Sequence, residues 1–212
     1  MDGVIIDTEQ EWNDVRRAYS ARWGGRWTDD DQRAVMGHNS RQWAAHIRER
    51  FEVPASEDEI IGGVVELLLR RYDEQLQLLP GVADAVRRLA GRCRLAVASS
   101  SPLAVIRHVL HATRLEDAFP VVVSSDEVAQ GKPAPDVYLT ACGRLGVDPA
   151  LAVAVEDSSN GICAAHNAGM RVIALPNRHF APAPEALALA ARVIGSAADL
   201  TPELVEAVAR GA

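Results

Sequence analysis

The chain has 212 residues, 48% of them hydrophobic and 24% charged, which is the composition of an ordinary globular protein with a buried core. A net charge of -7 argues against a nucleic-acid partner, and no apolar run approaches the roughly 20 residues of a membrane span. Since no signal peptide precedes the first motif, we expect a cytoplasmic protein whose three scattered cysteines stay reduced.

The first residues, Met1-Asp2-Gly3-Val4-Ile5-Ile6-Asp7, form a pattern typical of the exit from a β-strand. An acid and a glycine are followed by an apolar triplet and a second acid, so the body of the strand would lie before residue 1. We therefore expect the first strand of the fold to be largely missing from the sequence as given.

Residues 9–78 are predicted to be entirely helical. Apolar residues recur at three- and four-residue steps from Glu9, and further helices begin near Thr28 and Asn39. Ser56-Glu-Asp-Glu59 is a capping box that starts a fourth, longer helix. All four tryptophans lie in this segment, and core packing is a better interpretation of them than stacking on a ligand.

After Leu79-Pro80-Gly81 the pattern alternates between helices and short apolar runs. The runs predicted as strands are Arg94–Ala98, Val121–Val123, Leu151–Val155, Arg171–Leu175 and Ala191–Ile194. Strands separated by helices in this way predict an α/β fold with a doubly wound parallel sheet. We expect two domains: a Rossmann-like core of residues 1–8 and 79–212, and an inserted all-helical cap of residues 9–78.

Polar clusters follow successive predicted strands. Asp2 follows the missing strand, Ser99-Ser100-Ser101 and Lys132 come after the next two, and Glu156-Asp157 ends a fourth. Right-handed crossovers bring the carboxyl ends of parallel strands to one edge, so these clusters should converge. Hydroxyls and helix-start amides can hold phosphate oxygens, a lysine can neutralise their charge and acids can hold a metal. Together the clusters predict a site for phosphoryl transfer.

Each cluster alone also has a simpler interpretation. Glu156 and Asp157 would be stabilised by the positive end of the following helix, by up to about 1 kcal/mol, as readily as by a bound Mg²⁺. Ser99 would serve equally well as a helix cap, and a lone lysine in a Gly-Pro loop is usually solvated. The residues alone leave these alternatives open, and only the convergence of all four clusters favours chemistry.

The same clusters resemble the four motifs of the haloacid dehalogenase superfamily. The matching segments are Met1–Glu9, Val97–Ser101, Gly131–Asp136 and Val155–Gly161, and the resemblance covers essentially the whole chain. It is strongest to the β-phosphoglucomutase-like and sugar-phosphate phosphatase branch, which has a helical cap. The resemblance implies a Mg²⁺-dependent enzyme in which an aspartate is phosphorylated by a small-molecule phosphate ester and then hydrolysed.

By motif position, the resemblance implies a role for each matched residue. Asp2 resembles the general acid/base, whose backbone carbonyl would also contact the metal. Ser99 resembles the phosphate-binding hydroxyl, with Ser100 beside it, and Lys132 resembles the lysine that balances the negative charge. Asp157 resembles the metal-ligating acid. Glu156 would be a water-mediated partner of the metal.

Cap residues such as Trp12 and Arg71 are expected to contact the substrate. Trp12 occupies the position of a histidine in the β-phosphoglucomutases, and a tryptophan cannot relay a proton, so hydrolysis is favoured over a phosphomutase reaction. A response-regulator receiver is disfavoured because its acid pair comes first in the chain, whereas Glu156-Asp157 comes last. The sequence leaves the substrate and the oligomeric state open.

The sequence departs from the family pattern at the nucleophile. The family nucleophile lies two residues before the acid/base aspartate, and here only Met1 precedes Asp2. We expect that the sequence as given begins too late, at a methionine inside an Asp-Met-Asp-Gly motif. The alternative is a shortened chain that binds phosphate or metal without catalysis, because no carboxylate is present to form the covalent intermediate.

Overall fold

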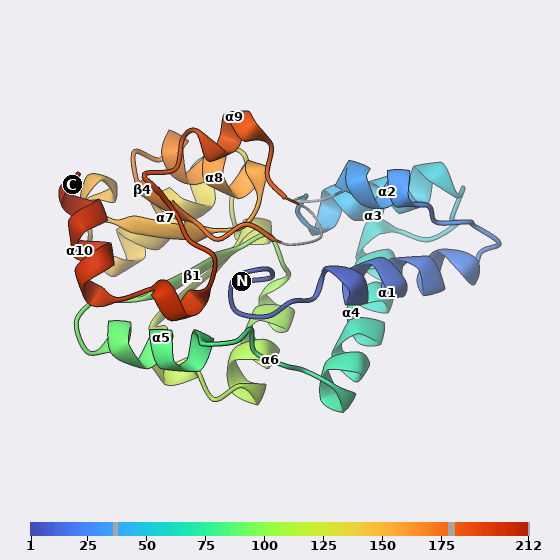
Figure 1. The fold of residues 1–212 in the computed structure, drawn as a ribbon. Helices are drawn as coiled ribbons and strands as arrows, with labels where there is room; N and C mark the ends of the chain where they lie inside the picture. Colours follow the sequence, from blue (N-terminus) through green and yellow to red (C-terminus); the bar gives the residue numbers. More distant parts are fainter. Residues whose placement is uncertain (36–37, 178–180, 212) are drawn as a thin grey trace.

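The computed structural model describes residues 1–35, 38–177 and 181–211, which form two units side by side (Figure 1). The helical unit consists of α1 (Glu9–Ala21), α2 (Asp29–Val35), α3 (Ser40–Arg50) and α4 (Glu57–Glu74). The strands of the second unit are β1 (Ala96–Ser99), β2 (Val121–Ser124), β3 (Val153–Glu156), β4 (Arg171–Ala174) and β5 (Arg192–Val193). Its α-helices are α5 (Val82–Ala90), α6 (Leu103–Ala112), α7 (Asp136–Leu145), α8 (Ser159–Asn167), α9 (Pro184–Leu187) and α10 (Pro202–Arg210).

The four helices of the helical unit all lie within residues 9–78. Ser56 caps α4 through a hydrogen bond from the Glu59 amide, and the Glu59 side chain bonds back to Ser56, which confirms the predicted capping box. Trp12 and Tyr19 lie on the buried face of α1. Trp23 does not, because α1 ends at Ala21 and the helical period no longer applies, so the expectation that all four tryptophans pack in the core is wrong at Trp23, which is 44% exposed.

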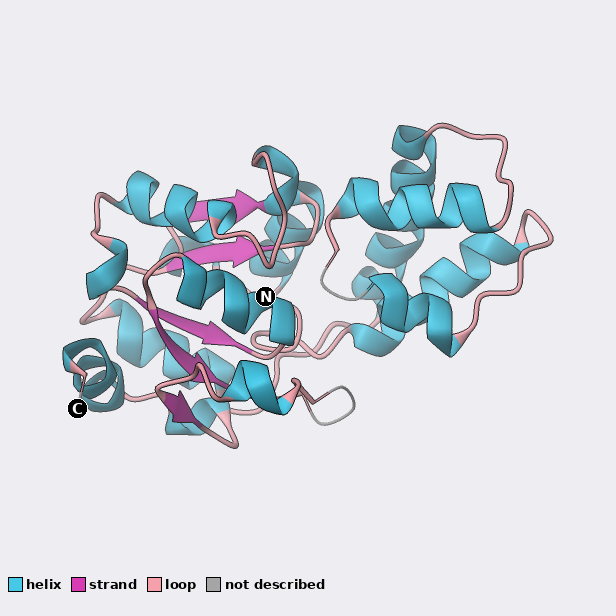
Figure 2. Ribbon diagram, turned by 90° about the horizontal axis from the view of Figure 1, so that it is seen from above, coloured by secondary structure: helices cyan, strands magenta, loops and turns pink. Residues whose placement is uncertain are grey.

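The strands are all parallel, as predicted, and point in the same direction in Figure 2. Within the described residues they form two sheets, β1–β2 and β3–β4–β5, and not one continuous sheet. In the two larger pairings, Ala96 lies opposite Val121 and Val153 opposite Arg171. The predicted fold class is confirmed, because helices cover both faces of the strands, while the division into two sheets was not foreseen.

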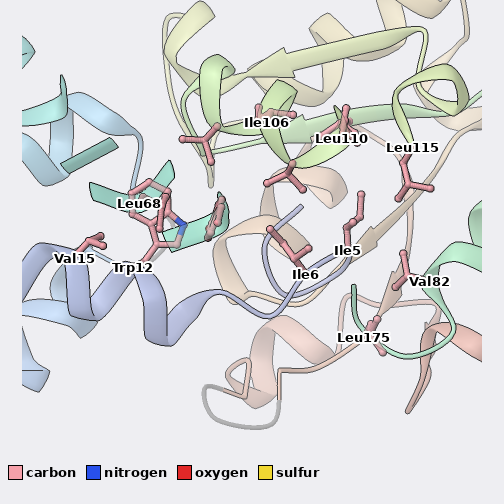
Figure 3. Packing of buried hydrophobic residues seen from close by; sticks show 14 of the residues in the cluster. Ile5, Ile6, Trp12, Val15, Leu68, Val82, Ile106, Leu110, Leu115 and Leu175 are labelled. Carbon is pink, nitrogen blue, oxygen red and sulfur yellow. The ribbon is translucent and has the colours of Figure 1, made fainter. Parts of the chain in front are cut away.

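Two apolar clusters hold the strands between the helices. One lies under α7, α8 and α9 and includes the buried Val137 and Ile162. The other lies under α5, α6 and α10 and continues into the helical unit. Figure 3 shows Ile5 and Ile6 among the side chains of this second cluster. Burial of a side chain of this size contributes about 1.5–3 kcal/mol, so the N-terminal loop is anchored in the core.

Backbone hydrogen bonds also fix the N-terminal loop. The Gly3 amide donates to the Ile6 carbonyl at 2.7 Å, the Ile5 amide to the Met1 carbonyl at 2.7 Å, and the Leu79 amide to the Ile5 carbonyl at 2.9 Å. Asp2 is therefore held in place although it is the second residue of the sequence.

The three cysteines are free: Cys142 is buried, and Cys93 and Cys163 are partly buried. Among the described helices, none combines the length and the apolar character needed to cross a bilayer.

Candidate active site

A pocket of about 410 Å³ lies where the carboxyl ends of β1 and β3 face the helical unit. Its wall contains all but one of the site residues predicted from the sequence, namely Asp2, Trp12, Ser99, Ser100, Lys132, Glu156 and Asp157. The strand-end clusters therefore meet at one edge of the strands, as right-handed parallel connections require. Asp157 in particular shares this wall with Ser99 and Lys132, the arrangement on which the predicted phosphate site depends.

Asp2 accepts three hydrogen bonds through its carboxylate. The Thr8 hydroxyl and the Trp12 indole N–H donate to Oδ1, at 2.6 and 3.1 Å, and the Ser101 hydroxyl donates to Oδ2 at 2.6 Å. Burial alone would raise the pKa of the Asp2 carboxyl, but the positive N-terminus and these three donors outweigh it and hold the pKa below its usual value. The carboxylate is therefore ionised and fixed in orientation.

In the turn after β1, Ser99 both caps the local backbone and lines the pocket. The Ser99 hydroxyl accepts a hydrogen bond from the Ser101 amide at 3.1 Å, so it does act as a local cap. The Ser124 hydroxyl donates to the Ser101 carbonyl at 2.7 Å and fixes the turn from β2. Ser99 and Ser100 also line the pocket.

Lys132 and Glu156 form a buried ion pair in the pocket wall. Lys132 Nζ lies 2.5 Å from Glu156 Oε1 and 3.2 Å from the Ala98 carbonyl, and the Tyr138 hydroxyl donates to the same Glu156 oxygen. Burial would raise the pKa of Glu156, but the positive charge of Lys132 overcomes it and lowers that pKa well below its usual value. Burial and then the charge of Glu156 raise the pKa of Tyr138, so Tyr138 remains a donor.

Glu156 pairs with Lys132, whereas the sequence led us to expect that it would contact the metal through a water molecule. Its second oxygen, Oε2, accepts from the Asp157 amide at 3.2 Å and the Ser158 hydroxyl at 3.3 Å. With both oxygens engaged by donors, Glu156 positions Lys132 and the start of α8. The reason is the alternation of side chains along a strand, which directs Glu156 and Asp157 to different sides.

Asp157 lies against the N-terminal loop. A Cβ atom added at Gly3 would stand 1.9 Å from Asp157 Oδ2, and Gly3 has a φ of +69°, so only glycine allows this approach. The sequence pattern Asp-Gly at the start of the chain thus brings the Asp157 carboxylate next to the backbone that carries Asp2.

The carboxylates of Asp2 and Asp157 have the oxygen chemistry that Mg²⁺ prefers. Within the described ranges, however, no three or more His, Cys, Asp or Glu side chains lie close enough together to hold a metal ion. Glu156 is engaged with Lys132, and both oxygens of Asp2 accept hydrogen bonds. The described residues therefore fit Mg²⁺ in type, through Asp157, but supply only part of a ligand set.

Arg71 does not belong to this pocket. Its side chain is 44% exposed and donates to Asp14 Oδ2 at 3.1 Å, so that it joins α4 to α1 on the surface. Arg71 thus lies outside this pocket wall, because its direction depends on how α4 packs against α1, and its contact with the substrate stays a prediction.

The helical unit contributes a cation that the sequence reasoning missed. The Arg16 guanidinium lies 4.8 Å from the ring centre of Trp12 and 5.5 Å from that of Trp43, and it donates to Gln32 at 3.2 Å. Arg16 lines the pocket although it is almost completely buried. The available signal was its spacing, since Arg16 follows Trp12 by four residues and shares its helix face.

Arg16 also makes this wall of the pocket electropositive. Burial, followed by the positive charges of His46 and Arg16, lowers the pKa of His38, which lines the pocket as well. The pocket thus combines acids at the strand ends with the Arg16 cation of the helical unit.

Comparison with known proteins places the chain in a family. Residues 1–175 match the family described as haloacid dehalogenase-like hydrolase. The chain is 35% identical to a phosphorylated carbohydrates phosphatase of Thermotoga maritima, over 82% of this chain and 81% of the relative. It is 34% identical to a bifunctional riboflavin kinase/FMN phosphatase of Arabidopsis thaliana over 84% of this chain, and spans 47% of that longer protein.

Among solved structures, CbbY from Rhodobacter sphaeroides in complex with phosphate superimposes with a TM-score of 0.85 and 28% identity, covering 97% of this chain and 96% of that one. The family match covers most of the sequence and includes every strand-end cluster described above. The chain belongs to the haloacid dehalogenase-like hydrolase family.

Proposed function

We propose that the protein is a Mg²⁺-dependent phosphatase of small phosphate esters, sugar phosphates among them. The observation that carries this proposal is the single pocket whose wall joins Asp2, Ser99, Lys132 and Asp157. The similarity to a phosphatase of phosphorylated carbohydrates supports the substrate class. Residues 9–78 act as the cap in this proposal, since they supply the Trp12 wall of the pocket. A cytoplasmic location stays a prediction.

The phosphoryl group would lie between Ser99 and Lys132. A phosphate monoester carries up to two negative charges, and Lys132 is the cation of the core that reaches this part of the pocket. Glu156, Tyr138 and the Ala98 carbonyl fix its ammonium group, so little reorganisation is needed when the ester binds. The hydroxyls of Ser99 and Ser100 would donate to the phosphate oxygens.

Mg²⁺ would be held by the Asp157 carboxylate and the Asp2 backbone carbonyl. When bound, it offsets the charge of the phosphoryl oxygens. The covalent route further requires a nucleophilic aspartate two residues before Asp2, a position that the sequence as given does not include. To test the chemistry we define the extended chain, in which the segment Val-Ile-Val-Phe-Asp is joined to the amino group of Met1.

Asp2 would serve as the general acid/base. Its lowered pKa and three hydrogen-bond donors suit the second half-reaction, in which the carboxylate removes a proton from water. The first half-reaction needs the protonated form, which the free protein disfavours. Substrate binding would therefore have to displace at least one donor, and Trp12, which belongs to the cap, is the donor that cap movement would shift.

The phosphomutase alternative finds less support. A phosphomutase must release and rebind an intermediate, and Trp12 at the cap position carries only a donor N–H, which cannot relay a proton. The binding-only alternative rests on the missing nucleophile and applies to the chain as given. In the extended chain, hydrolysis of a sugar phosphate would release free phosphate, whereas a phosphomutase reaction would give an isomeric phosphate ester.

In the extended chain, Asp2→Asn is expected to lower kcat/KM for glucose 6-phosphate by at least about 100-fold, and for p-nitrophenyl phosphate by a much smaller factor. The reason is that a sugar alkoxide needs a proton to leave, whereas p-nitrophenolate does not. Initial rates of phosphate release with Mg²⁺ provide the measurement.

Asp7→Asn is the matched control, because Asp7 is exposed and lies outside the pocket wall. Equal losses for the two esters would contradict leaving-group protonation by Asp2. No phosphate release from either ester by the extended chain would contradict the phosphatase proposal as a whole.

A further inference from the structure

The part of the pocket wall that belongs to the helical unit is basic. Arg16 of α1, Arg33 of α2 and His38, between α2 and α3, all line the pocket. We call these three side chains the basic wall. Within the described residues, no Asp or Glu of the helical unit lines the pocket beside them. Basic side chains that converge on one cavity repel one another, and a bound anion relieves that repulsion.

Arg16 is the buried member of the basic wall, and packing alone does not account for it. The Arg16 side chain is only 7% exposed, and its guanidinium lies over the rings of Trp12 and Trp43, whose centres are 6.1 Å apart. An apolar side chain next to two tryptophans would pack as well and would avoid the cost of removing a charge from water. A guanidinium, in contrast, can bind a carboxylate or a phosphate through two parallel hydrogen bonds.

Trp12 places Arg16 on the leaving-group side of the site. The Trp12 indole N–H donates to the Asp2 carboxylate at 3.1 Å, and the Arg16 guanidinium lies 4.8 Å from the centre of the same indole. In the proposed reaction Asp2 protonates the leaving oxygen, while Ser99 and Lys132 hold the transferred phosphoryl group. Arg16 is therefore one tryptophan ring away from the leaving alcohol, and the phosphoryl group has its own cation in Lys132.

We propose that Arg16 is a specificity-determining residue that selects phosphate esters whose alcohol carries a second anionic group, either a carboxylate or a further phosphate. This inference rests on the proposed phosphatase function and names the part of the substrate that the helical unit recognises. The pocket volume of about 410 Å³ is within the range of small-molecule sites. Arg33, the exposed member of the basic wall, would add to the positive potential that attracts such an ester.

Titration calorimetry on the chain as given, in the presence of Mg²⁺, tests the inference through binding alone. Two pairs of ligands differ only in the second anion: fructose 1,6-bisphosphate against fructose 6-phosphate, and 3-phosphoglycerate against glycerol 3-phosphate. In at least one pair, the ligand with two anions is expected to bind about 10-fold more tightly than its partner, as hydrogen bonds to a charged group would produce. The pair with the larger ratio identifies the second anion as a phosphate or a carboxylate.

Arg16→Met is expected to reduce this ratio of affinities to about 2-fold or less, and to change the affinity for the ligand with one anion by less than about 3-fold. Methionine keeps the apolar contact with the two tryptophans but cannot bind an anion. Arg16→Lys should retain part of the ratio, because lysine supplies the charge without the planar fork. A purely structural role of Arg16 would instead weaken both ligands of a pair alike and leave the ratio unchanged.

Arg17→Met is the matched control, because it removes the same charge from the next residue of α1. The Arg17 side chain is 49% exposed and pairs with Asp14, outside the pocket wall. This variant should keep the ratio of the parent to within about 2-fold, and a loss as large as that in Arg16→Met would overturn the proposal.

Equal affinities within both pairs for the parent, or an unchanged ratio in Arg16→Met, would also overturn the proposal but would leave the phosphatase function standing. Failure of all four ligands to bind would contradict the phosphate site itself, and this inference with it.

Discussion

Replacing Asp157 by alanine in the extended chain is expected to lower kcat/KM for phosphate release by roughly 1000-fold, equivalent to about 4 kcal/mol of transition-state stabilisation. Asp157 is the carboxylate of the pocket that lies against the Gly3 backbone and whose oxygens are of the type that binds Mg²⁺. Without the Asp157 carboxylate, Mg²⁺ would not be held in place to offset the charge of the phosphoryl oxygens. Initial rates over a titration with Mg²⁺ measure the effect.

Asp117→Ala serves as the control, because Asp117 is an exposed acid outside the pocket wall. It should keep both the rate and the Mg²⁺ dependence of the extended chain. If Asp157→Ala retained the same dependence on Mg²⁺ as its parent, the assignment of Asp157 to the metal would have to be abandoned.

Lys132→Met is expected to destabilise the chain by about 3–5 kcal/mol at pH 7, because it leaves the buried Glu156 carboxylate without its partner. The size of the loss should depend on pH. In the parent, the folded pKa of Glu156 lies below the ordinary value of 4.5, so this group stabilises the fold above that pH and its contribution fades as the pH falls further. In the variant, burial without Lys132 raises the pKa of Glu156, which takes up a proton in mild acid.

The difference in the free energy of unfolding between parent and variant should therefore shrink from pH 7 to pH 4. Urea unfolding at the two pH values measures it. The double variant Lys132→Met with Glu156→Gln is the control, since it removes the carboxylate charge and should recover part of the loss at pH 7. A loss of the same size at both pH values would show that the destabilisation does not come from the Glu156 charge.

Much of the fold can be read from the sequence because buried parallel strands are continuous apolar runs. The prediction of Arg94–Ala98 and Leu151–Val155 matches β1 and β3 to within one or two residues. α9 was missed because four residues starting at a proline give no helical period. The division into two sheets was not foreseen either, since strand patterns carry no information about which neighbours are present.

The candidate site could likewise be predicted from the sequence only in part. Topology alone predicts that Ser99, Lys132 and Asp157 share one edge, because parallel strands end together. Which side chains pair with one another depends on packing. Lys132 and Glu156 are 24 residues apart, and their ion pair follows from the direction of one side chain at the end of β3. The position of Arg71 outside the pocket wall could not be predicted for the same reason, because its direction follows from the packing of α4 on α1.

The most direct measurement of whether the strand-end clusters form a phosphate site is a crystal structure of the protein with inorganic phosphate and Mg²⁺. The expected result is a phosphate whose oxygens lie within hydrogen-bond distance of the Ser99 hydroxyl and the Lys132 ammonium, with the metal on Asp157. A phosphate bound only elsewhere, or Ser99 and Lys132 on separate surfaces, would contradict it.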